Sequence, residues 1–187
     1  MRILALIAAA AVLIAAPAAK AAPTWVVDKA ASRLGFVAAM NGQAINGAFR
    51  RWDARIAFDP ADLGSSSVFA TIDTASAATG DQTRDESLPT PDWFAAKSFP
   101  QASFTSRRFV ALGGGRYQAQ GDLRIRNVVK PIVLPFTLVI AGDTAKLTGA
   151  VDLDRTAFGV GQGQFKGTEA VAAKVQVTLN LTAHRAH

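Results

Sequence analysis

The stretch AKVQVTLNLTA, residues 173–183, alternates between apolar and polar side chains at every step. Val175, Val177, Leu179 and Leu181 belong to the apolar set, and Lys, Gln, Thr and Asn occupy the positions between them. Successive side chains of a β-strand point to opposite faces, so this period of two predicts a strand with one face in a core and the other in water. A complete polar face favours antiparallel pairing, because parallel sheets are usually covered on both sides.

Segments of the same character recur along the chain. Residues 116–126 and 144–156 alternate most regularly, and turn signals such as Asn41-Gly42 and the three glycines at 113–115 separate neighbouring segments. The alternation changes phase near Arg50-Arg51, so we expect one long strand over 44–59 with a bulge or bend there. We predict strands over residues 24–28, 32–40, 44–59, 66–73, 102–112, 116–126, 128–140, 144–156 and 173–183.

Pro131 and Pro135 interrupt one of these segments. Proline has no N–H to donate to a neighbouring strand, so we expect an edge, a bulge or a kink there. About eight strands with almost no helix predict an all-β fold, either a sandwich or a closed antiparallel barrel. An eight-stranded barrel has an interior wide enough for side chains or for one ligand.

Residues 79–94, TGDQTRDESLPTPDWF, do not fit a strand pattern. We expect a short helical segment around 75–95, with Asp81 as an N-cap and the prolines at 89 and 91 ending any helix. Asp81, Arg84, Asp85 and Glu86 could supply an acid and a base, but a cation between carboxylates keeps them ionised. We therefore interpret Asp81, Arg84 and Asp85 as a clamp that holds a loop near the mouth of the β-structure.

The first residues have the features of a signal peptide. Arg2 precedes an apolar run of about fourteen residues, too short for a bilayer span of roughly 20, and a small-x-small site ends at Ala21. We predict a signal peptide over 1–21, with cleavage after Ala21, and one domain over 22–187. We expect an exported, periplasmic protein.

Composition excludes several classes of chemistry. The 187 residues contain no cysteine and two histidines, His184 and His187, both in the C-terminal tail. Thiol catalysis and thiolate metal sites are therefore excluded, and we expect no catalytic triad, no metal site and no cofactor.

The net charge of +6 comes from scattered residues without a sustained basic run, so we expect no nucleic-acid binding. The glycines at 159, 161 and 163 are not followed by a helical pattern, which favours a mobile hairpin loop over a phosphate site.

Large aromatic residues gather around the irregular segment. Trp52, Trp93, Phe94, Phe99 and Phe104 could all belong to an ordinary core. An apolar cavity with few polar groups is also typical of a small-molecule site. The residue types alone leave both interpretations open.

In order along the chain, several motifs resemble the YceI-like family of polyisoprenoid-binding proteins. They are Trp25-Val26-Val27-Asp28, Gly47-Ala48-Phe49, Thr79-Gly80-Asp81 with Arg84-Asp85, Trp93-Phe94, Phe99-Pro100, Gly121-Asp122-Leu123, Lys130-Pro131, Asp154-Arg155 and Phe158-Gly159.

The resemblance covers essentially the whole chain after the signal peptide, and it implies a lipocalin-like, eight-stranded antiparallel barrel. It also implies an apolar tunnel that holds a polyisoprenoid, an isoprenoid quinone or another long-chain amphiphile. A homodimer and an inner-membrane partner of the cytochrome b561 type are implied as well. On this basis we expect the lipid to be bound by Phe36, Phe49, Trp93, Phe94, Phe104, Leu123, Ile125, Leu134, Phe136, Leu138 and Phe158.

The expected function is thus a carrier for an isoprenoid lipid, without catalysis. Two alternatives are an enzyme that modifies such a lipid and an accessory protein of a cytochrome b561-type membrane partner. An acid, base or metal inside the tunnel would favour the enzyme. No cysteine, and no histidine outside the tail, is present to supply one.

Overall fold

The computed structural model describes residues 21–186, and the predicted signal peptide therefore lies almost entirely outside the described residues. Strands dominate. The helical elements are the short helix α1 (Gln82–Ser87) and brief 3₁₀ turns such as Thr74–Ser76 and Thr156–Phe158. The strands are β1 (Thr24–Val27), β2 (Arg33–Met40), β3 (Gln43–Phe49), β4 (Trp52–Ala57), β5 (Ser67–Asp73), β6 (Ala77–Ala78), β7 (Gln101–Gly113), β8 (Arg116–Ile125), β9 (Val128–Ala141), β10 (Thr144–Asp154) and β11 (Lys174–Arg185).

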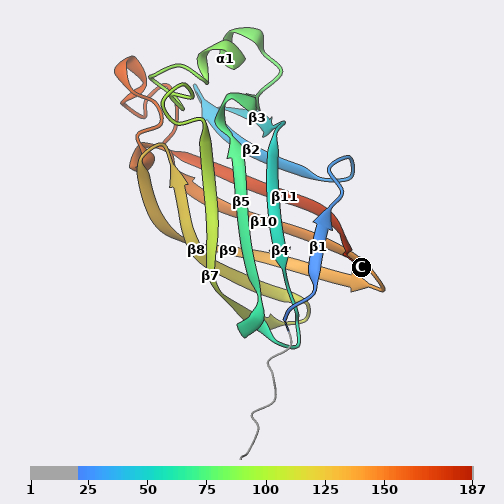
Figure 1. Cartoon of the computed structure of the whole chain (residues 1–187). Coiled ribbons are helices and arrows are strands. Elements are labelled where there is room, and N and C mark those ends of the chain that lie inside the picture. Colours follow the sequence, from blue (N-terminus) through green and yellow to red (C-terminus); the bar gives the residue numbers. More distant parts are fainter. Residues whose placement is uncertain (1–20, 187) are drawn as a thin grey trace, which may run out of the picture.

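Eight of these strands close into an antiparallel barrel in the order β1-β4-β5-β7-β8-β9-β10-β11. The barrel closes where Trp25 of β1 pairs with Arg185 of β11 and Val27 pairs with Ala183. In Figure 1, β4, β5 and β7 form the near wall, and β10 and β11 cross behind them. The all-β barrel predicted from the alternating segments is confirmed.

The single strand predicted over 44–59 is wrong, because the chain breaks at Arg50 and Arg51. β3 pairs with β2 and β6, whereas β4 pairs with β1 and β5. The amide of Arg50 donates to the carbonyl of Ser76 at 3.1 Å, and the amide of Arg51 donates to the Ser76 hydroxyl at 3.0 Å. These two bonds hold the backbone of Arg50 and Arg51 against the Thr74–Ser76 turn. The pairing between β2 and β3 therefore ends there, and the chain crosses to β4 in the barrel.

The hairpin of β2 and β3 extends the barrel wall. β2 pairs with β11 over residues 33–37, above the stretch of β11 that pairs with β1. β4 pairs with β1 only through Thr24↔Ala57 and Trp25↔Ile56. The upper part of β4 therefore has a strand neighbour on one side only, β5.

A second irregularity lies at the prolines of β9. Residues 136–141 of β9 pair with β10, whereas residues 128–135 pair only with β8. Pro131 and Pro135 lie in this half-paired stretch, so the predicted edge is confirmed. The pairing between β10 and β9 ends at Gly149 of β10, just before it would reach Pro135 of β9.

Both irregular connections lie at the upper end of the barrel in Figure 1. One is the segment with α1, and the other is the connection between β10 and β11, residues 155–173. Asp81 is the N-cap of α1, because its carboxylate accepts from the amide of Arg84 at 2.9 Å. No helix among residues 21–186 has both the length and the apolar character needed to cross a bilayer.

Candidate functional site: an apolar cavity along the barrel

A cavity of about 300 Å³ runs through the barrel. Its wall includes both Ala145 and Leu153 of β10, which are eight residues and therefore about 26 Å apart along an extended strand. Apolar side chains from all eight barrel strands form the wall, and Arg155 is the one charged residue among those that line it. Among residues 21–186, no polar atom is exposed to the cavity, so this wall can hold an apolar group but offers a ligand no hydrogen bond.

Every residue of the predicted lipid-binding set lies on this wall. They are Phe36, Phe49, Trp93, Phe94, Phe104, Leu123, Ile125, Leu134, Phe136, Leu138 and Phe158. The positions agree with the expectation, and lipid binding by these residues stays a prediction.

Sequence reasoning left out part of the wall. The cavity is also lined by residues outside the predicted lipid-binding set: Leu34, Trp52, Ile56, Val177 and Leu179. The alternation that defined the strands was sufficient to find them, since each lies at an apolar position on the inward face. Val177 and Leu179 are only half-buried although they point inward. An inward side chain that keeps accessible surface indicates unfilled space in the barrel.

Glycines on neighbouring strands let phenylalanine rings lie against the wall. Gly47 pairs with Phe36, and a Cβ at Gly47 would overlap the Phe36 ring. A Cβ at Gly121 would lie 2.7 Å from the Phe104 ring and would overlap the carbonyl oxygen of Thr105. A larger residue at either site would force the ring inward, so these glycines help to keep the cavity open.

Aromatic residues close the lower end. Phe58 lies 5.2 Å from Phe109 and 5.5 Å from Tyr117 between ring centroids, with nearly perpendicular rings. Phe136 stacks on Tyr117 at 5.5 Å. Trp25, which is 3% exposed, donates its indole N–H to the carbonyl of Phe58 at 3.0 Å. Edge-to-face packing of this kind gives a rigid floor.

Two loops cover the upper end and are tied to each other. Arg126 donates through Nη1 to the carbonyls of Trp93 and Gly159, one from each loop. The amide of Gln162 donates to the carbonyl of Asp92 at 2.6 Å. Trp93, one of the predicted lipid-binding residues, lies on the cavity wall beneath this cover, with its ring centroid 4.9 Å from that of Phe165.

Arg155 organises the loop between β10 and β11. Its side chain is 5% exposed and donates to four backbone carbonyls at 2.7–3.0 Å, those of Val160, Gly167, Val171 and Ala172. Burial lowers the pKa of Arg155, although an arginine remains protonated in proteins. The glycine-rich segment at 159–163 thus lies in the connection between two antiparallel strands, where Arg155 bonds to the carbonyl of Val160, and the mobility of this loop stays a prediction.

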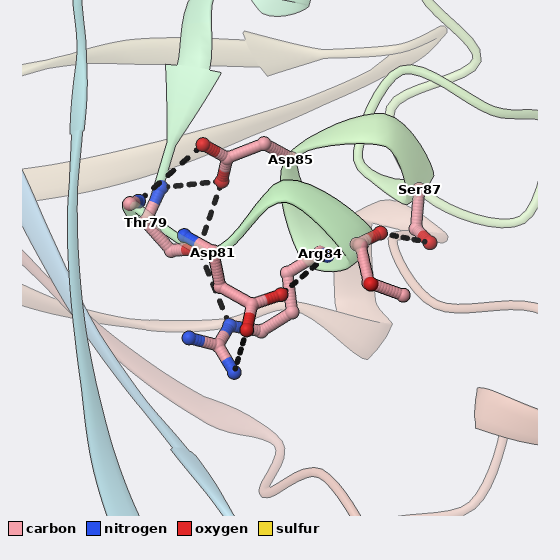
Figure 2. Close-up of polar contacts among 7 residues, drawn as sticks. Thr79, Asp81, Arg84, Asp85 and Ser87 are labelled. Carbon is pink, nitrogen blue, oxygen red and sulfur yellow. Dashed lines mark hydrogen bonds and ion pairs between the residues drawn. The ribbon is translucent and has the colours of Figure 1, made fainter.

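The predicted clamp forms, and its two carboxylates bind different partners (Figure 2). Arg84 pairs with Asp81, with Nη1 and Oδ2 3.6 Å apart. Asp85 instead accepts from the amide of Thr79 at 2.6 Å, from its hydroxyl at 2.8 Å and from the amide of Gly80 at 3.3 Å. The bond from the Thr79 amide is the main cause that lowers the pKa of Asp85. These contacts fix the loop, and none of the three side chains lines the cavity.

Among residues 21–186, no three His, Cys, Asp or Glu side chains gather in a way that could hold a metal ion.

Three comparisons with known proteins agree with this geometry. The YceI-like domain model matches residues 25–183. A UPF0312 protein of Vibrio vulnificus is 30% identical over 135 residues, which are 71% of each chain. A UPF0312 protein of Vibrio cholerae is 30% identical over 122 residues, and the match spans 65% of that relative and 62% of this chain.

Solved structures share the fold. The crystal structure of Burkholderia cenocepacia BcnA is similar with a TM-score of 0.81 and 35% identity, covering 83% of this chain and 98% of that one. The YCEI protein of Campylobacter jejuni gives a TM-score of 0.68 at 25% identity, covering 76% and 86%. A polyisoprenoid binding domain from Saccharophagus degradans, implicated in plant cell wall breakdown, gives 0.67 at 14% identity, covering 87% and 98%, and shows a likeness of fold alone.

Proposed function

Because the chain belongs to the YceI-like domain family, we propose that it binds a long-chain isoprenoid lipid or isoprenoid quinone whose tail occupies the barrel cavity. The observation that carries the proposal is the cavity itself, narrow, apolar throughout and extended along the strands. An isoprenoid tail is likewise long, narrow and without polar groups.

The energetics favour such cargo. Apolar surface removed from water contributes about 25 cal/mol per Å², so tail burial alone supplies affinity without specific polar contacts. An isoprenoid free in water exposes all of that surface and aggregates. Since the wall among the described residues presents no acid or base to the cavity, the proposal is for a binding protein and not for an enzyme.

Filling the cavity tests the proposal. Ala119 of β8 is 3% exposed and pairs with Phe109, and Ala145 lies on β10; both line the cavity. Ala119→Phe and Ala145→Phe should each lower the affinity for an added isoprenoid alcohol at least about tenfold, since a ring displaces tail from the cavity. The measurement is a titration of the delipidated protein followed by intrinsic tryptophan fluorescence.

The matched control is Ala111→Phe, because Ala111 is exposed on β7 and does not line the cavity. Circular dichroism of each variant confirms that the barrel has formed. Unchanged affinity in both folded cavity variants would contradict the proposal, as would a loss of affinity in the control.

The proposed carrier acts after export to the periplasm. The support is the segment 1–21 with its basic start, apolar run and small-residue site. N-terminal sequencing of the protein from an intact expression host should give Ala22 as the first residue, and a chain that still begins at residue 1 would contradict export.

A homodimer and exchange of cargo with a cytochrome b561-type membrane partner belong to the proposal on the family resemblance alone, and light scattering would test the dimer.

A further inference from the structure

A groove lies on the upper barrel wall between the β2–β3 hairpin and β4. β2 bonds to β11 and β3, and the upper part of β4 bonds only to β5, so no backbone pairing among the described residues joins the hairpin to β4. Leu34, Phe49 and Trp52 line this groove and also line the barrel cavity. These three residues therefore lie at the boundary between the cavity and the groove.

Four cations border this groove, which we call the cationic groove: Lys29, Arg33, Arg50 and Arg51. Lys29 lies 3.0 Å from the carboxylate of Asp53 and packs over the Trp52 ring at 3.8 Å. Arg51 pairs with Asp73 at 2.8 Å. Asp53 and Asp73 therefore offset the charges of Lys29 and Arg51, and the net positive charge of the groove comes from Arg33 and Arg50.

Arg33 and Arg50 form no ion pair among residues 21–186. The guanidinium of Arg33 makes one long contact, 3.5 Å from Nη2 to the carbonyl of Gly47. Arg50 is exposed, and the carboxylate of Asp85, on which its charge acts, already accepts hydrogen bonds from Thr79 and Gly80. Two guanidinium groups thus border the groove with unused donors.

Both ends of the barrel are covered in the described residues. The lower end is closed by Trp25, Phe58 and their aromatic neighbours, and the upper end is covered by the two loops that Arg126 ties together. A tail in the cavity can therefore leave its polar end at the side, in the groove that shares Leu34, Phe49 and Trp52 with the cavity.

We propose that the cationic groove is a headgroup subsite for an anionic amphiphile, a long-chain lipid that ends in a phosphate group. This inference rests on the proposed function and adds the charge class of the cargo. Guanidinium groups recognise phosphate oxygens through paired, charge-assisted hydrogen bonds. Arg33 and Arg50 would supply them, while Leu34, Phe49 and Trp52 contact the first carbons of the tail. An ordinary solvated surface would show no preference between a charged lipid and its neutral counterpart.

The test uses two ligands with the same tail, geranylgeranyl phosphate and geranylgeraniol. The delipidated wild-type protein should bind the phosphate about tenfold more tightly than the alcohol at low salt. The preference should shrink in 1 M salt, where the screening length falls to about 3 Å. The double variant Arg33→Gln, Arg50→Gln should lose the preference and keep its affinity for the alcohol.

Arg124→Gln is the matched control, because Arg124 is an exposed arginine on the outer face of β8, away from the groove. It should keep the full preference. Equal binding of both ligands by the wild type, or an unchanged preference in the double variant, would overturn the headgroup subsite while leaving the tail-binding function standing. If neither ligand binds, the proposed function fails as well.

Inorganic phosphate, titrated alone, separates a lipid headgroup from a free anion. It should bind at least about tenfold more weakly than geranylgeranyl phosphate, because it lacks the tail. Inorganic phosphate that binds as tightly as the lipid would assign the groove to a free anion and overturn the proposal.

Discussion

At the residue scale, Arg155 shows how backbone carbonyls hold a buried charge. Four backbone carbonyls accept its N–H groups, so the charge is solvated by peptide dipoles. The same bonds hold the loop that covers the upper end of the cavity. Removing the side chain would leave those carbonyls without their partner.

Arg155→Met should therefore lower the free energy of unfolding by at least about 3 kcal/mol, since each unsatisfied buried group costs about 1–3 kcal/mol. Arg155→Lys should also be destabilising, because one ammonium group cannot reach four carbonyls spread around a planar fork. Urea denaturation measures both effects. Arg108→Met is the control, since Arg108 is exposed and contacts only Gln120; a wild-type midpoint for Arg155→Lys would show this account to be wrong.

The stabilising contribution of Asp85 in the clamp depends on pH. Its folded-state pKa is lowered, chiefly by the bond from the Thr79 amide. Its stabilising contribution is therefore complete above the unfolded-state value of about 3.9 and is lost as the pH falls through the folded-state pKa. Asp85→Asn should reduce stability at pH 7 by about 1 kcal/mol and should make the loss of stability between about pH 5 and pH 3 smaller than in the wild type. Thermal melts across this range measure the difference, and parallel pH profiles for the two proteins would refute the role of Asp85.

At the element scale, glycine positions set the depth of the cavity wall. Gly121→Ala on β8 should lower the free energy of unfolding by about 1–3 kcal/mol, the usual cost of overpacking, because the carbonyl of Thr105 cannot move aside. Gly64→Ala, in a loop where only the flexible Asp62 carboxylate lies near, is the control. The melting temperatures of the two variants provide the comparison, and equal values would contradict the steric argument.

Local patterns predicted most strands because alternation is a property of a few consecutive residues. The same patterns placed a bulge or bend near Arg50 and Arg51 but could not show that the strand ends there, because the break depends on bonds to Ser76, 25 residues beyond Arg51. The helix N-cap at Asp81 was predictable from residues 81–84 alone, and it formed. Predictions thus succeeded where the cause is local and failed where a distant backbone group competes for the same amide.

At the scale of the whole molecule, the candidate site was predictable in its residues and not in its shape. Inward positions follow from alternation, but the space between them depends on strand number and stagger and on rings such as Phe36 lying flat over Gly47. The cationic groove was missed for a related reason. Arg33 and Arg50 flank the Leu34↔Phe49 pair at the end of the β2–β3 hairpin, but the opening that they border forms only because the chain crosses from this hairpin to β4.

Mass spectrometry of the protein purified from the periplasm tests most directly whether the barrel holds an isoprenoid tail. The native spectrum should show the chain with one lipid bound, and solvent extraction should release an isoprenoid or isoprenoid quinone in about equimolar amount. Ala119→Phe, expressed in the same way, should carry much less. A wild-type protein with the mass of the bare chain, which also takes up no added isoprenoid, would contradict the account.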